Sequence, residues 1–263
     1  MEQKIIFFDI DGTLVIEKEQ IIPESTINAL KKAKENGHLL FVNTGRPFCG
    51  LSKDLYSLNF DGYICGSGTH IYLGEDILYE KNIEKDRCFE IVEKLRECKI
   101  PAILEGKNSV YLDNQRTLIK ELVEMKEAFE GNGIDIVKTW DDENLDFSKL
   151  LIWINPESEE KEFFNFIRND FNFIKLKENV FEVFQKGHTK ATGIKRIQSH
   201  LTFDLNNCIT IGDSNNDLSM FEYVPNSILM GNGDTTLSNK VSFITKRVED
   251  NGIEHALKHF EII

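Results

Sequence analysis

Apolar residues in the first part of the chain fall alternately into short continuous runs and into helical spacings. Ile5–Phe8 is a continuous apolar run, which is typical of a parallel strand covered on both faces. Apolar residues three and four positions apart follow, and they predict a helix that opens at Pro23 and ends at Gly37. His38–Val42 is another buried run, and Pro47 starts a further helix. This order predicts a Rossmann-like, doubly wound parallel α/β sheet.

The same alternation of helix and strand returns near the end of the chain. The predicted elements there are a helix over Ala191–Ile197, a strand over Cys208–Ile211, a helix over Leu218–Tyr223 and a strand over Ser227–Met230. The two ends of the chain therefore contribute to one sheet.

The middle of the chain has a different pattern, with long amphipathic helices between short strands. The predicted helices are Glu84–Lys99, Gln115–Glu130 and Glu159–Arg168, and the predicted strands are Ala102–Leu104, Ser109–Leu112, Ile134–Val137 and Leu150–Ile154. A phenylalanine-rich stretch, Phe163–Phe173, is expected to pack in the core of this part. We predict an inserted α+β cap domain over 81–184 and a discontinuous core domain over 1–80 and 185–263.

Composition narrows the class of protein further. The 263 residues carry 31 Lys and Arg against 44 Asp and Glu, a net charge of −13, which disfavours nucleic acid as a partner. No apolar run is long enough for a membrane span, and the N-terminus enters a strand with no room for a signal peptide. The five cysteines are scattered without a Cys-x-x-Cys pair, so neither a disulfide framework nor a zinc site is expected. These features predict a cytoplasmic protein without membrane or nucleic-acid partners.

Three polar loops carry the candidate chemistry, and each follows a predicted parallel strand. They are Asp9–Thr13, Asn43–Arg46 and Gly212–Asp217. Ligands of open α/β sheets bind at the carboxyl ends of the strands, so the three loops are expected to meet at one site.

The first loop holds two carboxylates, Asp9 and Asp11, two residues apart. Such a pair can share a cation and divide the roles of nucleophile and acid–base group. The following Gly12 also makes Asp-Gly a hairpin signal. A hairpin needs alternating strands beside it, whereas a continuous apolar run precedes this one, and we therefore favour the chemical interpretation.

The third loop, Asp213–Asp217, resembles the start of a calcium loop. An EF-hand counted from Asp213 needs glycine and glutamate where this chain has Leu218 and Val224, so the calcium interpretation fails. Ser214–Asn216 can cap the next helix, and a capped helix start is also where anions bind.

The second loop offers a hydroxyl at Thr44 and an unobstructed backbone N–H at Gly45, both suited to a phosphate oxygen. Lys190, at the start of a predicted helix, is a candidate for the positive charge that an anionic substrate needs. A helical lysine can equally be a solvated side chain. His188 has no partner in the sequence, and we interpret it as structural.

These motifs together resemble the haloacid dehalogenase superfamily, specifically its Cof-type phosphatases with a large inserted α/β cap. The matching motifs in order are residues 8–14 (Phe-Asp-Ile-Asp-Gly-Thr-Leu), 44–46 (Thr-Gly-Arg), Lys190 and 212–217 (Gly-Asp-Ser-Asn-Asn-Asp). The resemblance extends to Gly231-Asn232 and to residues 251–253, and therefore covers essentially the whole chain. Departures from the family pattern are Ser67-Gly68-Thr69, Ser214 and His188.

The resemblance implies a metal site and a nucleophile. It makes Asp9 the nucleophile and a ligand of Mg²⁺, with Asp213 as a second ligand and Asp11 adding its backbone carbonyl. Hard oxygen donors of this kind suit Mg²⁺. The side chain of Asp11 would act as the general acid and base.

The resemblance also implies a phosphate site. Thr44, Gly45, Lys190 and Asn216 would contact the phosphate, and Asp217 would hold Lys190 or a metal-bound water in place. It implies a Mg²⁺-dependent phosphatase that hydrolyses a small phosphorylated metabolite through an aspartyl-phosphate. Two alternatives stay open, a phosphomutase of the same superfamily and a non-catalytic phospholigand-binding regulatory protein.

Overall fold

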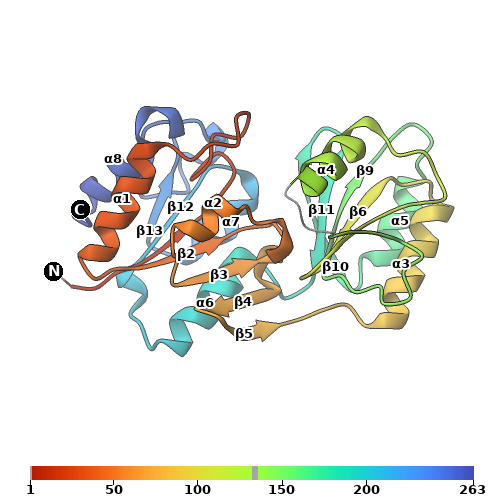
Figure 1. Ribbon diagram of the computed structural model, residues 1–263, viewed down its shortest axis with the longest axis horizontal. Helices are drawn as coiled ribbons and strands as arrows, with labels where there is room; N and C mark the ends of the chain where they lie inside the picture. Colours follow the sequence, from red (N-terminus) through yellow and green to blue (C-terminus); the bar gives the residue numbers. More distant parts are fainter. Residues whose placement is uncertain (1, 132–135) are drawn as a thin grey trace. The chain divides into compact units, whose positions relative to one another are not determined.

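A computed structural model describes residues 2–131 and 136–263 and divides into two compact units (Figure 1). The core unit contains the chain up to Gly45 together with Lys53–Tyr79 and His188–Ile263. The insert unit contains Arg46–Ser52 and Glu80–Gly187. The short segment Arg46–Ser52, called here the arm, was not expected in the insert. The predicted limits of the cap domain, 81 and 184, stay a prediction.

The core unit is built on an eight-stranded sheet with the order β14-β13-β12-β1-β2-β3-β4-β5. Pairing is parallel from β14 to β3 and antiparallel between β3 and β4. The strands are β1 (Ile5–Phe8), β2 (Leu39–Asn43), β3 (Gly62–Cys65), β4 (His70–Leu73), β5 (Asp76–Glu80), β12 (Cys208–Gly212), β13 (Asn226–Leu229) and β14 (Phe243–Ile244). The predicted doubly wound parallel sheet is confirmed.

Strand β1 lies in the middle of this sheet, as its continuous apolar run predicts. All four of its residues, Ile5–Phe8, are fully buried. Phe8 lies in register with Val42 of β2 and with Ile211 of β12. The loops that leave these three strands therefore start at the same edge of the sheet.

Helices cover both faces of the core sheet. The core helices are α1 (Glu24–Glu35), α2 (Lys53–Ser57), α6 (Lys190–His200), α7 (Leu218–Tyr223) and α8 (Gly252–His259). Residues of α6 and α7 pack with Ile5 and Phe7 on one face. Helices α1 and α8 lie side by side (Figure 1). Helix α1 ends as predicted before Gly37, whose φ of +87° favours glycine.

The helix predicted from Pro47 is wrong. A single 3-10 turn, Phe48–Gly50, follows Pro47, and the chain is extended at Leu51 before α2 begins. The Cys49 N–H donates to the carbonyl of Lys107 at 3.0 Å. This contact joins the arm to the rest of the insert unit.

The insert unit has a six-stranded sheet with the order β10-β11-β9-β6-β7-β8 and helices on both faces. Its strands are β6 (Ala102–Glu105), β7 (Val110–Leu112), β8 (Val137–Thr139), β9 (Lys149–Trp153), β10 (Phe171–Lys177) and β11 (Val180–Gln185). Helices α3 (Lys85–Glu97) and α5 (Glu160–Ile167) pack on one face, and α4 (Lys120–Gly131) packs on the other. The predicted α+β character of the insert is confirmed.

Some boundaries in the insert differ from the prediction. Helix α4 starts at Lys120 rather than at Gln115, because the Gln115 N–H donates to the Asp113 carboxylate in a turn. Of the strand predicted over Ile134–Val137, residues 134 and 135 lie outside the described residues. Phe173 is exposed and stacks on Phe164, so the phenylalanine-rich stretch is not wholly in the core.

None of the helices in the described part of the chain is both long and apolar enough to cross a bilayer.

Candidate active site

The loop after β1 is folded tightly against the loop after β12. The Asp9 N–H donates to the carbonyl of Ile211 at 2.9 Å, which fixes Asp9 directly beyond the strand. Gly12 has a φ of +75°, and a Cβ there would lie 2.5 Å from Oδ2 of Asp213. Only glycine allows this approach of the two loops. The Asp-Gly pair thus serves a loop rather than a hairpin between alternating strands.

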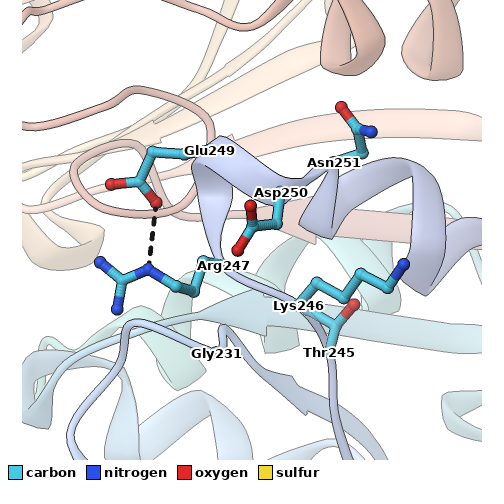
Figure 2. A pocket seen from close by; sticks show the side chains of 7 residues that line it. All are labelled: Gly231, Thr245, Lys246, Arg247, Glu249, Asp250 and Asn251. Atoms are coloured by element: carbon cyan, nitrogen blue, oxygen red, sulfur yellow. Dashed lines mark ion pairs between the residues drawn. The ribbon is translucent and has the colours of Figure 1, made fainter.

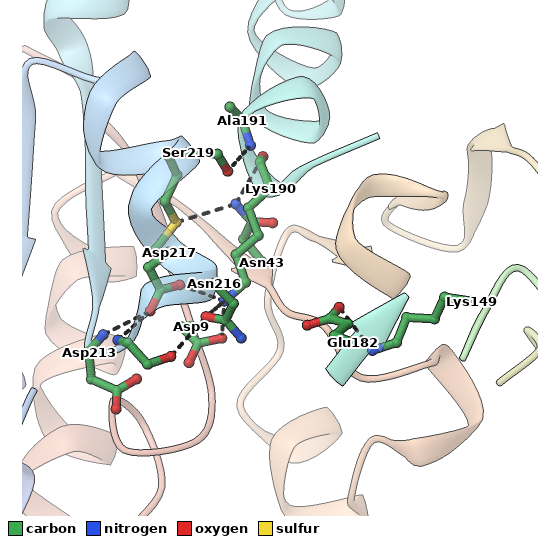
Figure 3. A network of polar contacts seen from close by, with 12 residues as sticks. Asp9, Asn43, Lys149, Glu182, Lys190, Ala191, Asp213, Asn216, Asp217 and Ser219 are labelled. Carbon is green, nitrogen blue, oxygen red and sulfur yellow. Dashed lines mark hydrogen bonds and ion pairs between the residues drawn. The ribbon is translucent and has the colours of Figure 1, made fainter. Parts of the chain in front are cut away.

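Lys190 is the centre of the site (Figure 3). Its ammonium is buried and lies 2.5 Å from Oδ1 of Asp9 and 2.5 Å from Oδ1 of Asp217. Oδ1 of Asn216 is 3.3 Å away. Lys190 is the first residue of α6, where Thr189 is the N-cap in a capping box with Thr192. The interpretation of Lys190 as a solvated helical side chain is excluded.

Asp217 joins Lys190 to the backbone of the third loop. Its second oxygen, Oδ2, accepts from the N–H groups of Asp213 at 2.9 Å and of Ser214 at 3.0 Å. Ser214 and Asp217 also form a capping box at the turn Asn215–Asp217. The capping interpretation of this loop therefore holds, and Asp217 pairs with Lys190 at the same time.

Three carboxylates gather beside the lysine. Oxygen atoms of Asp9, Asp213 and Asp217 lie within 4.8 Å of one another, close enough to hold a metal ion. Oδ1 of Asp213 is buried, and no hydrogen-bond partner for it is found among the described residues. Both oxygens of Asp217 are already paired, so Asp9 and Asp213 offer the available ligand atoms. The residues fit a hard divalent cation.

Burial and the neighbouring charges raise the pKa values of Asp9, Asp213 and Lys190. Burial raises the pKa of Asp9 to about 7, with Lys190 acting in the opposite direction and the carboxylates of Asp217 and Asp11 adding to the rise. Burial, together with Asp9 and Asp217, raises the pKa of Asp213 to about 8. Burial alone would lower the pKa of Lys190, but Asp217 and Asp9 more than offset it and raise that pKa well above its usual range.

The remaining predicted residues lie in the loops after β1 and β2. Asp11 is half-buried, and its charge raises the pKa of Asp9. Thr44 and Gly45 are buried and follow β2, the parallel neighbour of β1. The Thr44 N–H donates to Ile64, and its carbonyl accepts from Ser67, at 2.8 and 3.1 Å. These bonds tie the second loop to the loop after β3.

Two asparagines, which the sequence analysis named without assigning them a role, brace the site. Asn43 is fully buried, and its Nδ2 donates to the carbonyl of Lys190 at 3.2 Å. Asn232 donates to the carbonyl of Gly12 at 2.7 Å and accepts from the N–H of Val248 at 2.9 Å. The available signal was a lone polar residue at the carboxyl end of a strand or directly after one.

The insert unit contains a second buried lysine, which the sequence analysis also missed. Nζ of Lys149 lies 2.9 Å from Glu105 and 3.1 Å from Glu182, and all three residues are buried. Lys149 and Glu182 are drawn in Figure 3. The three residues come from strands β9, β6 and β11. Their signal was a charged residue within or at one end of an otherwise apolar strand.

A separate hollow in the core unit lies beside the loop after β14 (Figure 2). Its lining residues are Gly231, Thr245, Lys246, Arg247, Glu249, Asp250 and Asn251. Charges of both signs line it, and Arg247 pairs with Glu249 at 3.5 Å. None of the predicted site residues lines this hollow, so the candidate active site stays with the aspartate cluster.

The fold and the site together define a class. A doubly wound parallel sheet, an inserted α+β unit, and carboxylates around a buried lysine at the carboxyl edge are the features of a phosphohydrolase built on the haloacid dehalogenase plan. The family of haloacid dehalogenase-like hydrolases matches residues 6–257. The chain belongs to this family, and it is a phosphatase of the Cof-type branch.

Relatives and a solved structure agree with this assignment. The chain is 28% identical to the putative phosphatase YkrA of Bacillus subtilis, over the full length of both. It is 24% identical to the 5-amino-6-(5-phospho-D-ribitylamino)uracil phosphatase YitU of the same organism, with 99% of each chain covered. A solved structure of a subclass IIB sugar phosphatase of the superfamily is 28% identical and superposes with a TM-score of 0.83, covering 99% of this chain and all of that one.

Proposed function

We propose that the protein is a Mg²⁺-dependent phosphatase that hydrolyses a small phosphorylated metabolite through an aspartyl-phosphate on Asp9. The observation that carries the proposal is the buried ammonium of Lys190 between Asp9 and Asp217, with the unpartnered oxygen of Asp213 beside them. A buried positive charge and available carboxylates suit a dianionic phosphate and a cation together.

Asp9 and Asp213, with the backbone carbonyl of Asp11, would hold the Mg²⁺. When bound, the ion supplies Lewis-acid stabilisation of the phosphoryl oxygens. The raised pKa values of Asp9 and Asp213 support a cation at this place, because a positive charge would return both carboxyls to the ionised form. Ionised Asp9 is also the form that can act as a nucleophile.

Lys190, Asn216, the hydroxyl of Thr44 and the backbone N–H of Gly45 would bind the phosphate. Lys190 removes the repulsion between the Asp9 carboxylate and a dianionic substrate. The two amides that hold Oδ2 of Asp217 fix its other oxygen against Lys190, and this supports a positioning role for Asp217.

The reaction would run in two transfers. An oxygen of Asp9 bonds to phosphorus while the ester P–O bond breaks, and the side chain of Asp11 gives its proton to the leaving alkoxide. Asp11 then takes a proton from water, and the resulting hydroxide attacks the phosphorus. Inorganic phosphate leaves, and the carboxylate of Asp9 is restored.

The substrate class is proposed from the relatives. One of them acts, by its name, on a phosphorylated ribitylaminouracil, and another is a sugar phosphatase. Both substrates are small phosphate monoesters. We propose the same class for this chain, acting in the cytoplasm without a nucleic-acid partner, as the net charge of −13 favours.

The test is release of inorganic phosphate from p-nitrophenyl phosphate with and without Mg²⁺, using Asp9→Asn as the inactive control. We expect release that requires Mg²⁺ and that the Asp9 variant lacks. A purified, folded protein that binds phosphate but never releases it from the ester would contradict the proposal and favour a phospholigand-binding protein. Transfer to a second hydroxyl in place of water would favour a phosphomutase.

A further inference from the structure

The turn that leads into Lys190 has an unusual anchor. His188 is buried two residues before Lys190, and its Nε2 lies 2.9 Å from the hydroxyl of Tyr79. The two rings also stack with their centroids 5.8 Å apart. The residues are 109 positions apart in the chain, so this contact is a feature of the fold and not of a local turn.

Both partners lie where the chain passes between the two units. Tyr79 is the last residue of the core unit before the chain enters the insert, and His188 is the first core residue after the chain returns. The hydrogen bond therefore fastens the outgoing connection to the returning connection within the core unit. We call this pair the clasp.

The clasp also contacts helix α6 through Arg196. The guanidinium of Arg196 lies over the ring of Tyr79, 3.9 Å from its centre, and Arg196 also donates to the carbonyl of Thr192. Thr192 is the capping-box partner of Thr189, the residue between His188 and Lys190. The contacts thus form a closed ring from His188 through Tyr79 and Arg196 back to the helix start.

Lys190 depends on the geometry of this helix start. Its ammonium makes short contacts with two carboxylates, 2.5 Å each, at a buried position where the side chain has little room to adjust. A misplacement of its Cα by a fraction of an ångström would lengthen at least one of these contacts. Positioning errors of this size reduce catalytic rates strongly.

We propose that Tyr79 and His188 are positioning residues for Lys190, which fasten the start of α6 to both connections of the insert. The inference rests on the proposed function, because it gives the clasp a role in phosphoryl transfer.

The test compares variants that remove the hydrogen bond, with Tyr79→Phe as the one that keeps both rings. Tyr79→Phe keeps the ring under Arg196 and removes the hydroxyl. His188→Leu removes the hydrogen bond, whereas His188→Gln keeps a group that can pair with the phenol. The matched control is Tyr223→Phe. It removes a phenol hydroxyl that donates, at 3.2 Å, to Gln198 further along helix α6.

Two measurements on the full chain read the effect. The first is kcat and KM for p-nitrophenyl phosphate with Mg²⁺, and the second is hydrogen exchange of the amides of 188–191 without substrate. We expect kcat to fall about 2- to 12-fold in Tyr79→Phe and His188→Leu. This is the fold-change that corresponds to the free energy of one neutral hydrogen bond, if its loss lowers the fraction of molecules in which Lys190 is correctly placed. KM should change less, and exchange should accelerate in the same two variants.

The controls separate positioning from packing. His188→Gln should recover most of the kcat lost in His188→Leu. The double variant of Tyr79→Phe and His188→Leu should lose no more kcat than the worse of the two single variants. Tyr223→Phe should leave kcat and the exchange of 188–191 unchanged. Wild-type kcat in Tyr79→Phe would overturn the inference, whether or not exchange changes. If the wild-type protein releases no phosphate, the proposed function fails; unchanged exchange in Tyr79→Phe would then overturn the clasp separately.

Discussion

Replacement of Lys190 by methionine tests the site most directly, because it removes one charge and keeps most of the side-chain volume. The ammonium is about 1% exposed and contacts two carboxylates at 2.5 Å. Removing one partner of a buried ion pair costs about 3–5 kcal/mol, because the other charge stays buried without compensation. Solvent screening is minor at this depth, so we expect the free energy of unfolding to fall within that range.

The same change should reduce turnover much more than stability alone explains. In the proposed function Lys190 stabilises the transferring phosphoryl group, and loss of one such contact lowers kcat about 10²–10³-fold. The assay is Mg²⁺-dependent release of p-nitrophenol, measured below the unfolding transition and normalised to the folded fraction from a denaturation curve. Urea denaturation gives the stability of each variant in the same buffer.

Lys149→Met is a matched control within the same chain. Lys149 is also buried and also pairs with two carboxylates, at 2.9 and 3.1 Å. We expect a comparable loss of stability of about 3–5 kcal/mol and turnover per folded molecule that stays within a few-fold of wild type. Turnover in Lys190→Met equal to that of Lys149→Met would refute the assignment of Lys190 to the phosphate site.

The remaining predictions concern the aspartates and the loop that holds them. Asp9→Asn should form no phosphoenzyme in an acid-quench experiment, whereas Asp11→Asn should lose about 10²–10⁴ in kcat on an alkyl phosphate and less on an aryl phosphate, whose leaving group needs little protonation. Equal losses on both esters would contradict the acid role of Asp11. The folded-state pKa values of Asp9 and Asp213, about 7 and 8, lie above the usual carboxyl value, so the metal-free protein binds more protons folded than unfolded. Its stability should therefore decrease as pH rises from about 4 to 8. Mg²⁺ should raise the unfolding temperature more at pH 8 than at pH 6. A larger rise at pH 6 would argue against a cation at these carboxyls. Gly12→Ala should destabilise the protein by about 1–3 kcal/mol and weaken Mg²⁺ binding, because its Cβ would meet Asp213; calorimetric titration with Mg²⁺ would show an unchanged affinity if the loops can separate.

The edge of the sheet that carries the site could be predicted from the sequence for a physical reason. A buried apolar run such as Ile5–Phe8 indicates a parallel strand, and parallel strands present their carboxyl ends at one edge. Polar loops after such runs must then lie near one another, whatever the residues between them. The positions of Asp9 and Asp213 follow from this rule without any knowledge of side-chain contacts.

Side-chain pairs from distant segments could not be predicted in this way. The Tyr79–His188 bond joins residues 109 positions apart, and neither residue carries a local pattern that identifies the other. The arm Arg46–Ser52 is a similar case. Pro47 predicts a helix locally, but the chain makes a single 3-10 turn there, and the Cys49 N–H bonds to Lys107 in the insert. Tertiary contacts commonly override local propensity in this manner.

The charge of the site explains why a phosphatase with an acidic chain can bind a dianion. Asp9, Asp213 and Asp217 contribute three negative charges when ionised, and Lys190 contributes one positive charge, so the cluster carries −2. The raised pKa values of Asp9 and Asp213 favour the protonated form of these carboxyls near neutral pH, which lowers the negative charge. A protonated Asp9 is a poor nucleophile, and an ionised one repels the substrate. The proposed Mg²⁺ would resolve both problems, since a divalent cation balances −2 and keeps Asp9 ionised. The cluster, with Lys190 included, would then be neutral and would no longer repel a dianionic phosphate, although the whole chain carries −13.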